Sequence, residues 1–260
     1  MPFSENQGIR FYTFASFPNE KVTHAILSRK GGVSPSIWES LNVGGTVGDD
    51  RSRVIENRMR SFRAMGRDPH SMFDVWQVHS ADVVIANAPH ELRPPEFKAD
   101  AIITDNPEVT LFMRFADCTP ILLFDPVKSA IGLVHAGWLG TIRQVTSEAV
   151  RAMTAAYGSR PGDIVAGIGP SIGPDHYEIG PDVISRVRET FHKDSDDLLV
   201  GYGDRIHFDL WQANKLLLEQ AGVEQVELSN ICTACNPEDW YSHRAQNGKT
   251  GRFGALFALK

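Results

Sequence analysis

Three residues whose side chains bind metals or transfer protons stand at the ends of apolar segments of this 260-residue chain. His79 ends the segment FDVWQVH, Cys118 lies between VTLFMRF and PILLFD, and His135 ends AIGLVH. Two imidazoles and one thiolate are a ligand set for zinc that leaves the fourth tetrahedral position open to water or substrate. A zinc ion held in this way can bring the pKa of its water to about 7. We therefore take His79, Cys118 and His135 as candidate metal ligands and catalytic residues.

The spacing of these residues leaves a second interpretation open. Separations of 39 and 17 residues form no local metal-binding motif, so the sequence alone does not require the three side chains to meet. A histidine at a strand end is more commonly a hydrogen-bonded structural residue, and free cysteine is among the most buried residue types.

The elements that must position these residues are mostly strands. Short runs rich in β-branched and aromatic residues predict strands over 73–79, 82–86, 101–105, 109–115, 120–125, 130–135, 163–169, 225–230 and 252–259. Apolar periodicity and capping residues predict helices over 52–66, 140–158, 181–191 and 209–222. Because several strands follow one another before any long helix intervenes, we expect an α+β fold with mixed β-sheets, in one domain over residues 1–260.

Composition and charge exclude several classes of protein. The chain is 42% hydrophobic and 22% charged with a net charge of −6, and its basic residues are scattered, so we expect no nucleic-acid partner. No apolar run is long enough for a membrane span. The first 14 residues lack the pattern of an export signal, and an odd count of three cysteines suits a reducing compartment. We expect a cytoplasmic protein.

Cys232 and Cys235 form a single C-x-x-C motif. No second such motif completes a four-cysteine zinc site, and the surrounding sequence is not of the thioredoxin type. The pair is either redox-active or packed in the interior, and we favour packing.

Ten short motifs resemble, in the same order, those of the YfiH-type laccase-domain family. They are SRKGGVS (28–34), SLNVG (40–44), VGDD (47–50), ENR (56–58), QVHS (77–80), ADCTPILLFDP (116–126), HAGWLGT (135–141), GPSIGPDHYEIG (169–180), CTAC (232–235) and TGRFG (250–254). The resemblance implies a layered architecture in which helices sandwich mixed sheets. It also implies that His79, Cys118 and His135 form a zinc site at the bottom of a cleft, with copper as a possible alternative metal.

The activity that the resemblance implies is that of a purine nucleoside phosphorylase with adenosine deaminase activity. Phosphate would displace the base from adenosine, inosine or methylthioadenosine to leave ribose 1-phosphate, and water would release ammonia from adenosine. The expected partners are purine nucleosides and phosphate, and we expect a monomer or a weak homodimer. Leu139 stands where the family pattern has an arginine, which places phosphorolysis in doubt if that arginine binds phosphate. Ser171, Asp175 and His176 replace cysteines of the pattern.

Four residues are candidates for substrate binding. Arg29 precedes a Gly-Gly pair and Arg244 lies in a second basic segment, so either can bind an anion. Asn42 and Gln77 lie in family motifs and can hydrogen-bond a base or ribose.

Three further residues lie beside the candidate ligands. Asp117 precedes Cys118 and is a candidate carboxylate partner for a ligand histidine. Trp76 and Trp138 flank the ligands and can stack on a purine.

Two other functions remain open at this point. Two histidines and a cysteine also suit copper, so a laccase-like copper polyphenol oxidase is one alternative. Against it, the nine histidines include no H-x-H pair of the kind a cluster of several coppers needs. The other alternative is a metal-free hydrolase of peptidoglycan precursors, with Cys118 as nucleophile and a histidine as base.

Overall fold

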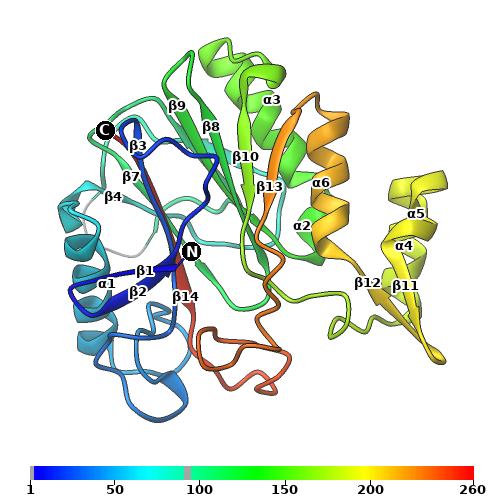
Figure 1. The fold of residues 1–260 in the computed structure, drawn as a ribbon, viewed down its shortest axis with the longest axis horizontal. Helices are drawn as coiled ribbons and strands as arrows, with labels where there is room; N and C mark the ends of the chain where they lie inside the picture. The colour runs from blue at the N-terminus through cyan, green and yellow to red at the C-terminus, as the bar shows by residue number, and fades with distance from the viewer. Residues whose placement is uncertain (1–2, 91–94) are drawn as a thin grey trace.

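Two six-stranded sheets lie face to face in the computed structural model, which describes residues 3–90 and 95–260 (Figure 1). The first sheet has the spatial order β1 (Phe3–Asn6), β2 (Ile9–Tyr12), β3 (Val22–Leu27), β14 (Phe253–Leu259), β7 (Thr110–Phe115) and β4 (Met72–Phe73). The second has the order β13 (Gln225–Leu228), β10 (Val165–Ile168), β8 (Thr119–Asp125), β9 (Ala130–Ala136), β6 (Ala101–Thr104) and β5 (Val83–Ile85). Parallel pairs β4–β7, β5–β6 and β10–β13 accompany antiparallel ones, so both sheets are mixed.

Helices cover the outer face of each sheet (Figure 1). Helix α1 (Arg51–Ala64) lies on the first sheet, and α3 (Val145–Tyr157) and α6 (Leu210–Gln220) lie on the second. The short helix α2 (Trp138–Ile142) follows β9 directly. The remaining elements extend to one side and are α4 (Pro181–Phe191), α5 (Ser195–Leu198), β11 (Leu199–Tyr202) and β12 (Arg205–Phe208). The expected α+β fold, with mixed sheets sandwiched by helices, is confirmed.

Alternating residues of the central strands fill the two sides of the second sheet. On β8, Leu122 and Phe124 pack in the cluster between the sheets, whereas Ile121 and Leu123 pack in the cluster that includes Val150 of α3. All four strand residues are at most 1% exposed. This period of two is what a strand buried on both faces requires, and it makes β8 and β9 a rigid base for the residues at their ends.

Three sequence expectations about elements are wrong or incomplete. The expected helix over 140–158 is divided into α2 and α3 by Gln144, whose φ of 62° is left-handed. The expected strand over 73–79 ends at Phe73, and His79 lies in a loop. The strands β1, β2, β3, β11 and β12 lie outside the segments expected to form strands. In the part of the chain that the structure describes, no helix is long and apolar enough to span a bilayer.

His24 is a titratable residue of β3 in the apolar layer between the sheets. Its Nε2 accepts a hydrogen bond from Phe14 N at 2.9 Å, and the rings of Phe14, Phe17 and Phe257 surround it. Burial lowers the pKa of His24 to about 4, since a charged imidazole would lose its hydration there. The folded protein therefore keeps His24 neutral at a pH where the unfolded chain binds a proton.

We expect this histidine to make the fold sensitive to acid. As the pH falls from 6.5 towards 4, only the unfolded chain takes up the proton, so the free energy of unfolding should fall by about 3 kcal/mol from this group. The measurement is urea unfolding against pH for the unaltered chain and for His24→Gln, whose amide oxygen can still accept from Phe14. The exposed His70→Gln serves as control. Equal pH dependence in all three proteins would contradict the expectation.

Candidate metal centre

The register of the β8–β9 hairpin brings Cys118 and His135 together. Thr119 pairs with Ala136 and Pro120 with His135, so Cys118 lies opposite Gly137 at the open end of the hairpin. The 17-residue spacing is therefore the length of two paired strands and their turn. His135 is 5% exposed, and Cys118 is half-buried.

His79 reaches the same place from the loop between β4 and β5. Its φ of 57° is left-handed, a conformation uncommon for a residue other than glycine. One ligand atom each from His79, Cys118 and His135 lies within 4.8 Å of the others. All three residues predicted from the sequence thus converge.

The Asp100 carboxylate holds both histidines. Ala101 of β6 pairs with Val134 of β9, which places Asp100 opposite His135, and Asp100 Oδ1 lies 2.8 Å from His135 Nδ1. Asp100 Oδ2 accepts the backbone N–H groups on either side of His79, from Val78 at 3.1 Å and from Ser80 at 2.6 Å. One buried carboxylate therefore fixes the imidazole of His135 and the backbone of His79.

The ionisable side chains of this centre shift one another's pKa values. Burial alone would lower the pKa of His135, but its interactions with Cys118 and Asp100 outweigh burial and raise that pKa to about 9. Burial and the nearby charge of His135 lower the pKa of His79. For Asp100, burial opposes ionisation, yet the hydrogen bonds from His135 and from the backbone lower the pKa. Asp100 is thus held as a carboxylate that accepts the hydrogen bond from His135 Nδ1, which leaves Nε2 available to a metal.

Gly137 lies against two of the three candidate ligands. A Cβ atom at this position would lie 2.8 Å from Cys118 Sγ and 3.0 Å from His79 Nδ1. The backbone of Gly137 has an ordinary φ of −77°, so the restriction comes from the site and not from the chain conformation. A thiol and two imidazoles with their ligand atoms this close together are a donor set that can hold a single zinc or copper ion.

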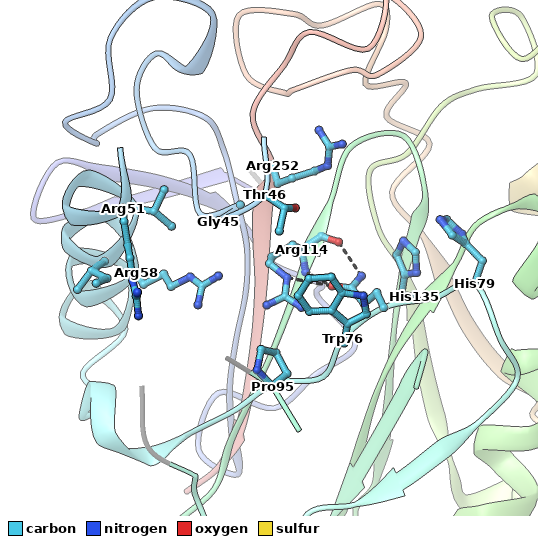
Figure 2. A pocket seen from close by; sticks show the side chains of 14 residues that line it. Gly45, Thr46, Arg51, Arg58, Trp76, His79, Pro95, Arg114, His135 and Arg252 are labelled. Atoms are coloured by element: carbon cyan, nitrogen blue, oxygen red, sulfur yellow. Dashed lines mark hydrogen bonds between the residues drawn. The ribbon is translucent and has the colours of Figure 1, made fainter. Parts of the chain in front are cut away.

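A cavity of about 500 Å³ opens from the two histidines. In the view of Figure 2, the indole of Trp76 lies between the histidines and the guanidinium groups of Arg58 and Arg114. The polar and aromatic residues that line the cavity are Thr46, Arg51, Arg58, Trp76, Gln77, His79, Arg114, His135 and Arg252. This volume is in the range that binds small molecules.

Positive charge exceeds negative charge around this cavity. Arg114 is bonded to the buried Asp74, and Arg58 Nη1 lies 3.9 Å from the same carboxylate. Burial and the like charge of Arg114 lower the pKa of Arg58 to about 10, despite the attraction of Asp74. Arg252 donates to the backbone oxygens of Thr250 and Gly251, and burial lowers its pKa also. A bound anion would relieve this repulsion.

Two of the four predicted substrate residues contribute to this cavity. Gln77 lines it, and its amide bonds Arg114 at the backbone N (3.0 Å), the backbone O (2.8 Å) and Nε (3.2 Å). Asn42 is buried behind the wall, where its Oδ1 accepts from Gly44 N and Arg252 N. Asn42 therefore positions two residues of the lining.

The other two predicted substrate residues have partners elsewhere. Arg29 donates to Glu39 O and Pro237 O and lies over the Tyr241 ring. The guanidinium of Arg244 donates to Glu178 O. The structure does not bring either guanidinium to the described lining of the cavity.

Of the three residues expected to act beside the candidate ligands, one lines the cavity and two have other contacts. Trp76 lines the cavity and is 46% exposed, whereas Trp138 is half-buried in α2 beneath Arg186. Asp117 is not the carboxylate partner of a ligand histidine. It accepts from Thr233 Oγ1 and Arg244 N, each at 2.7 Å, and Asp100 takes the role expected of it.

We expect Asp100→Asn to weaken metal binding. The amide would present N–H groups to His135 Nδ1, so Nε2 would carry the imidazole proton and lose its capacity to bind a metal. Zinc affinity should fall about 10- to 100-fold, as measured by competition with a chelator. Asp105→Asn removes an exposed carboxylate beyond the far end of β6 and should leave the affinity unchanged. Unaltered affinity in folded Asp100→Asn would refute the role of this carboxylate.

Gly137→Ala tests the space between the ligands. The added methyl group must displace Cys118 Sγ or His79, so zinc affinity should fall by at least about tenfold while the fold is kept. Gly162→Ala is the matched control, because nothing lies within 4 Å of its Cβ position. Zinc titration and circular dichroism of both variants give the answer, and equal affinities would contradict the geometry.

Known proteins resemble the chain along most of its length. A sequence profile of the family described as "Multi-copper polyphenol oxidoreductase laccase" matches residues 23–260. Purine nucleoside phosphorylase of Deinococcus radiodurans is 38% identical over 242 residues, 93% of this chain and 91% of that protein. Purine nucleoside phosphorylase YlmD of Bacillus subtilis is 35% identical over 252 residues, 93% of this chain and 90% of that protein.

Solved structures agree with this relationship. The crystal structure of a hypothetical protein YfiH from Bacillus licheniformis has a TM-score of 0.92 at 31% identity, covering 100% of this chain and 99% of that one. YlmD from Geobacillus stearothermophilus has a TM-score of 0.93 at 30% identity with the same coverage. The chain therefore belongs to the YfiH/YlmD family of laccase-domain proteins.

Proposed function

We propose that this protein is a zinc-dependent purine nucleoside phosphorylase. The observation that carries the proposal is that one cavity joins two of the three metal-binding residues to a group of arginines. Phosphate would bind at the arginines, and the nucleoside would lie between them and the histidines. The names of the relatives from D. radiodurans and B. subtilis support the same assignment.

Different residues in and beside the cavity would bind the phosphate, the purine and the metal. Arg58 and Arg252 would hold the phosphate dianion, since guanidinium groups bind phosphate oxygens in a fixed geometry. The exposed face of Trp76 would stack on the purine. His79, Cys118 and His135 would hold zinc, which supplies Lewis-acid stabilisation of the charge that develops in the reaction. Attack of phosphate at C1′ would break the glycosidic bond and release the base, with Asp100 keeping His135 in position.

Leu139 does not remove the charge that phosphate needs. It is a half-buried residue of α2 and is not among the described residues that line the cavity. Four arginines line that cavity without it. The replacement of the family arginine at this position is therefore compatible with phosphate binding at Arg58 and Arg252.

Deamination of adenosine is the less supported half of the expected activity. Zinc deaminases use a glutamate as general acid and base beside the metal. The described lining of the cavity contains no aspartate or glutamate, and Asp100 is engaged by His135 and the His79 loop. The described lining, with arginines and no free carboxylate, thus favours phosphorolysis over deamination.

A metal-free hydrolase is the second candidate, and one observation favours it. Cys118, His135 and Asp100 form a nucleophile, base and carboxylate in the order that cysteine hydrolases use. A polyphenol oxidase with several coppers is less well supported. Its copper cluster needs many histidines, whereas each of the two ligand groups found in the described residues contains at most two.

Metal removal separates these functions. The zinc-loaded protein should release free base and ribose 1-phosphate from inosine or adenosine only when phosphate is present, as followed by chromatography. Chelation should abolish this release, and added zinc should restore it. Absence of phosphate-dependent base release from fully loaded protein would overturn the proposal. Hydrolysis of a peptidoglycan precursor by stripped protein would instead favour the cysteine hydrolase.

Arg252→Gln tests the phosphate end of the cavity. The variant loses one charged hydrogen-bond donor, so kcat/KM for phosphate should fall about 10- to 100-fold, mainly through KM. Arg63→Gln removes an exposed charge from the end of α1 and is the matched control. If steady-state kinetics gave the same phosphate KM for both variants, the phosphate site would lie elsewhere.

A further inference from the structure

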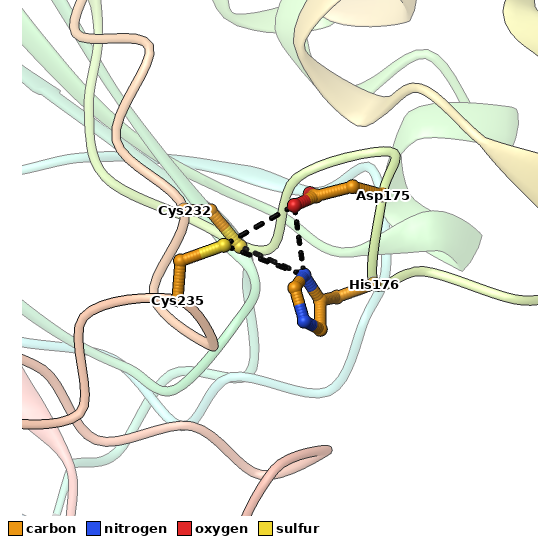
Figure 3. Close-up of side chains that lie close together, drawn as sticks. All are labelled: Asp175, His176, Cys232 and Cys235. Atoms are coloured by element: carbon orange, nitrogen blue, oxygen red, sulfur yellow. Dashed lines mark hydrogen bonds and ion pairs between the residues drawn. The ribbon is translucent and has the colours of Figure 1, made fainter.

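Figure 3 shows a second group of side chains of metal-binding types, none of which is among the described residues that line the cavity. Asp175 and His176 come from the loop between β10 and α4, and Cys232 and Cys235 come from the loop between β13 and β14. One ligand atom from each of the four lies within 4.8 Å of the others. We propose that these residues bind a second, structural zinc ion.

The distances between the donor atoms suit tetrahedral zinc. His176 Nδ1 lies 2.9 Å from Asp175 Oδ2, 3.4 Å from Cys235 Sγ and 3.8 Å from Cys232 Sγ, and Cys235 Sγ lies 3.1 Å from Asp175 Oδ2. Zinc bonds of ordinary length place tetrahedral ligands roughly 3.3–3.8 Å apart. A small outward movement of Asp175 would complete that geometry.

The backbone around this group is arranged to hold thiolates. Gly173 N donates to Cys232 Sγ at 3.2 Å, and a Cβ on Gly173 would lie 2.6 Å from Asp175 Oδ1. Ser171 and Cys232 form a parallel bridge, which sets the two loops in register. Two thiols, an imidazole and a carboxylate held this close together are a donor set that binds zinc.

Four protein ligands leave no position open for substrate, so this ion would be structural. Its effect would reach the first centre through Thr233, which lies between the two cysteines. Thr233 Oγ1 donates to Asp117 Oδ1, and the main-chain oxygen of Asp117 accepts from Ile172 N at 3.0 Å. Because Asp117 precedes Cys118, the second ion would clamp together the segments that hold the Cys118 loop.

The test is the zinc content of the reduced, zinc-equilibrated full chain after desalting, measured by mass spectrometry. We expect about two zinc ions per chain, falling to about one in Cys118→Ala and to about one in Cys235→Ser. Glu238→Gln, an exposed substitution in the same loop, should keep both. Because the two cysteine variants lose different ions, failure of this inference is distinguishable from failure of the proposed function.

A second measurement, alkylation of the cysteines in the unaltered protein, does not depend on whether the variants fold. Zinc should protect Cys232 and Cys235 from iodoacetamide, and the milder Asp175→Asn should weaken that protection. Zinc-independent alkylation of both thiols, together with a single zinc that disappears in Cys118→Ala, would overturn the proposal.

Discussion

The hydrogen bonds of the buried Asp100 carboxylate are the interaction on which the candidate metal centre depends. One oxygen faces His135 Nδ1, and the other accepts the two N–H groups that flank His79. An ionised carboxylate with no exposed surface is costly unless charged or polar donors surround it. The donors that surround Asp100 are the imidazole of His135 and the backbone N–H groups beside His79. The hydrogen bonds that stabilise the buried charge are therefore the same ones that position the two histidines.

The second sheet positions these residues relative to one another. Cys118, His135 and Asp100 lie at one end of the adjacent strands β8, β9 and β6, so strand register sets their relative positions. The cavity then runs from the histidines towards arginines of β7 and α1 and towards Arg252, which directly precedes β14. A centre built on strands with arginines on neighbouring elements can hold a metal and an anion at a fixed separation, which suits displacement by phosphate.

Part of this arrangement could be predicted from the sequence. Apolar runs on either side of Cys118 and before His135 marked these two residues as candidate ligands, because the ends of strands commonly border binding sites. The signal missed was the hairpin itself, since two paired runs joined at residues 126–129 explain the spacing. Asp100 could not be distinguished from Asp117, because its partners lie 20 to 35 residues away in sequence. For Cys232 and Cys235 the sequence favours packing, because it contains no second C-x-x-C and no thioredoxin-type context, and His176 lies 56 residues from Cys232 along the chain.

Anomalous diffraction from a crystal of the zinc-loaded protein tests the central claim most directly. Data collected at the zinc absorption edge should give a peak about 2.0–2.3 Å from Cys118 Sγ and from one nitrogen of each of His79 and His135. The His135 nitrogen should be Nε2, with Nδ1 still bonded to Asp100. A zinc-loaded crystal with no anomalous density among these three side chains would contradict the account.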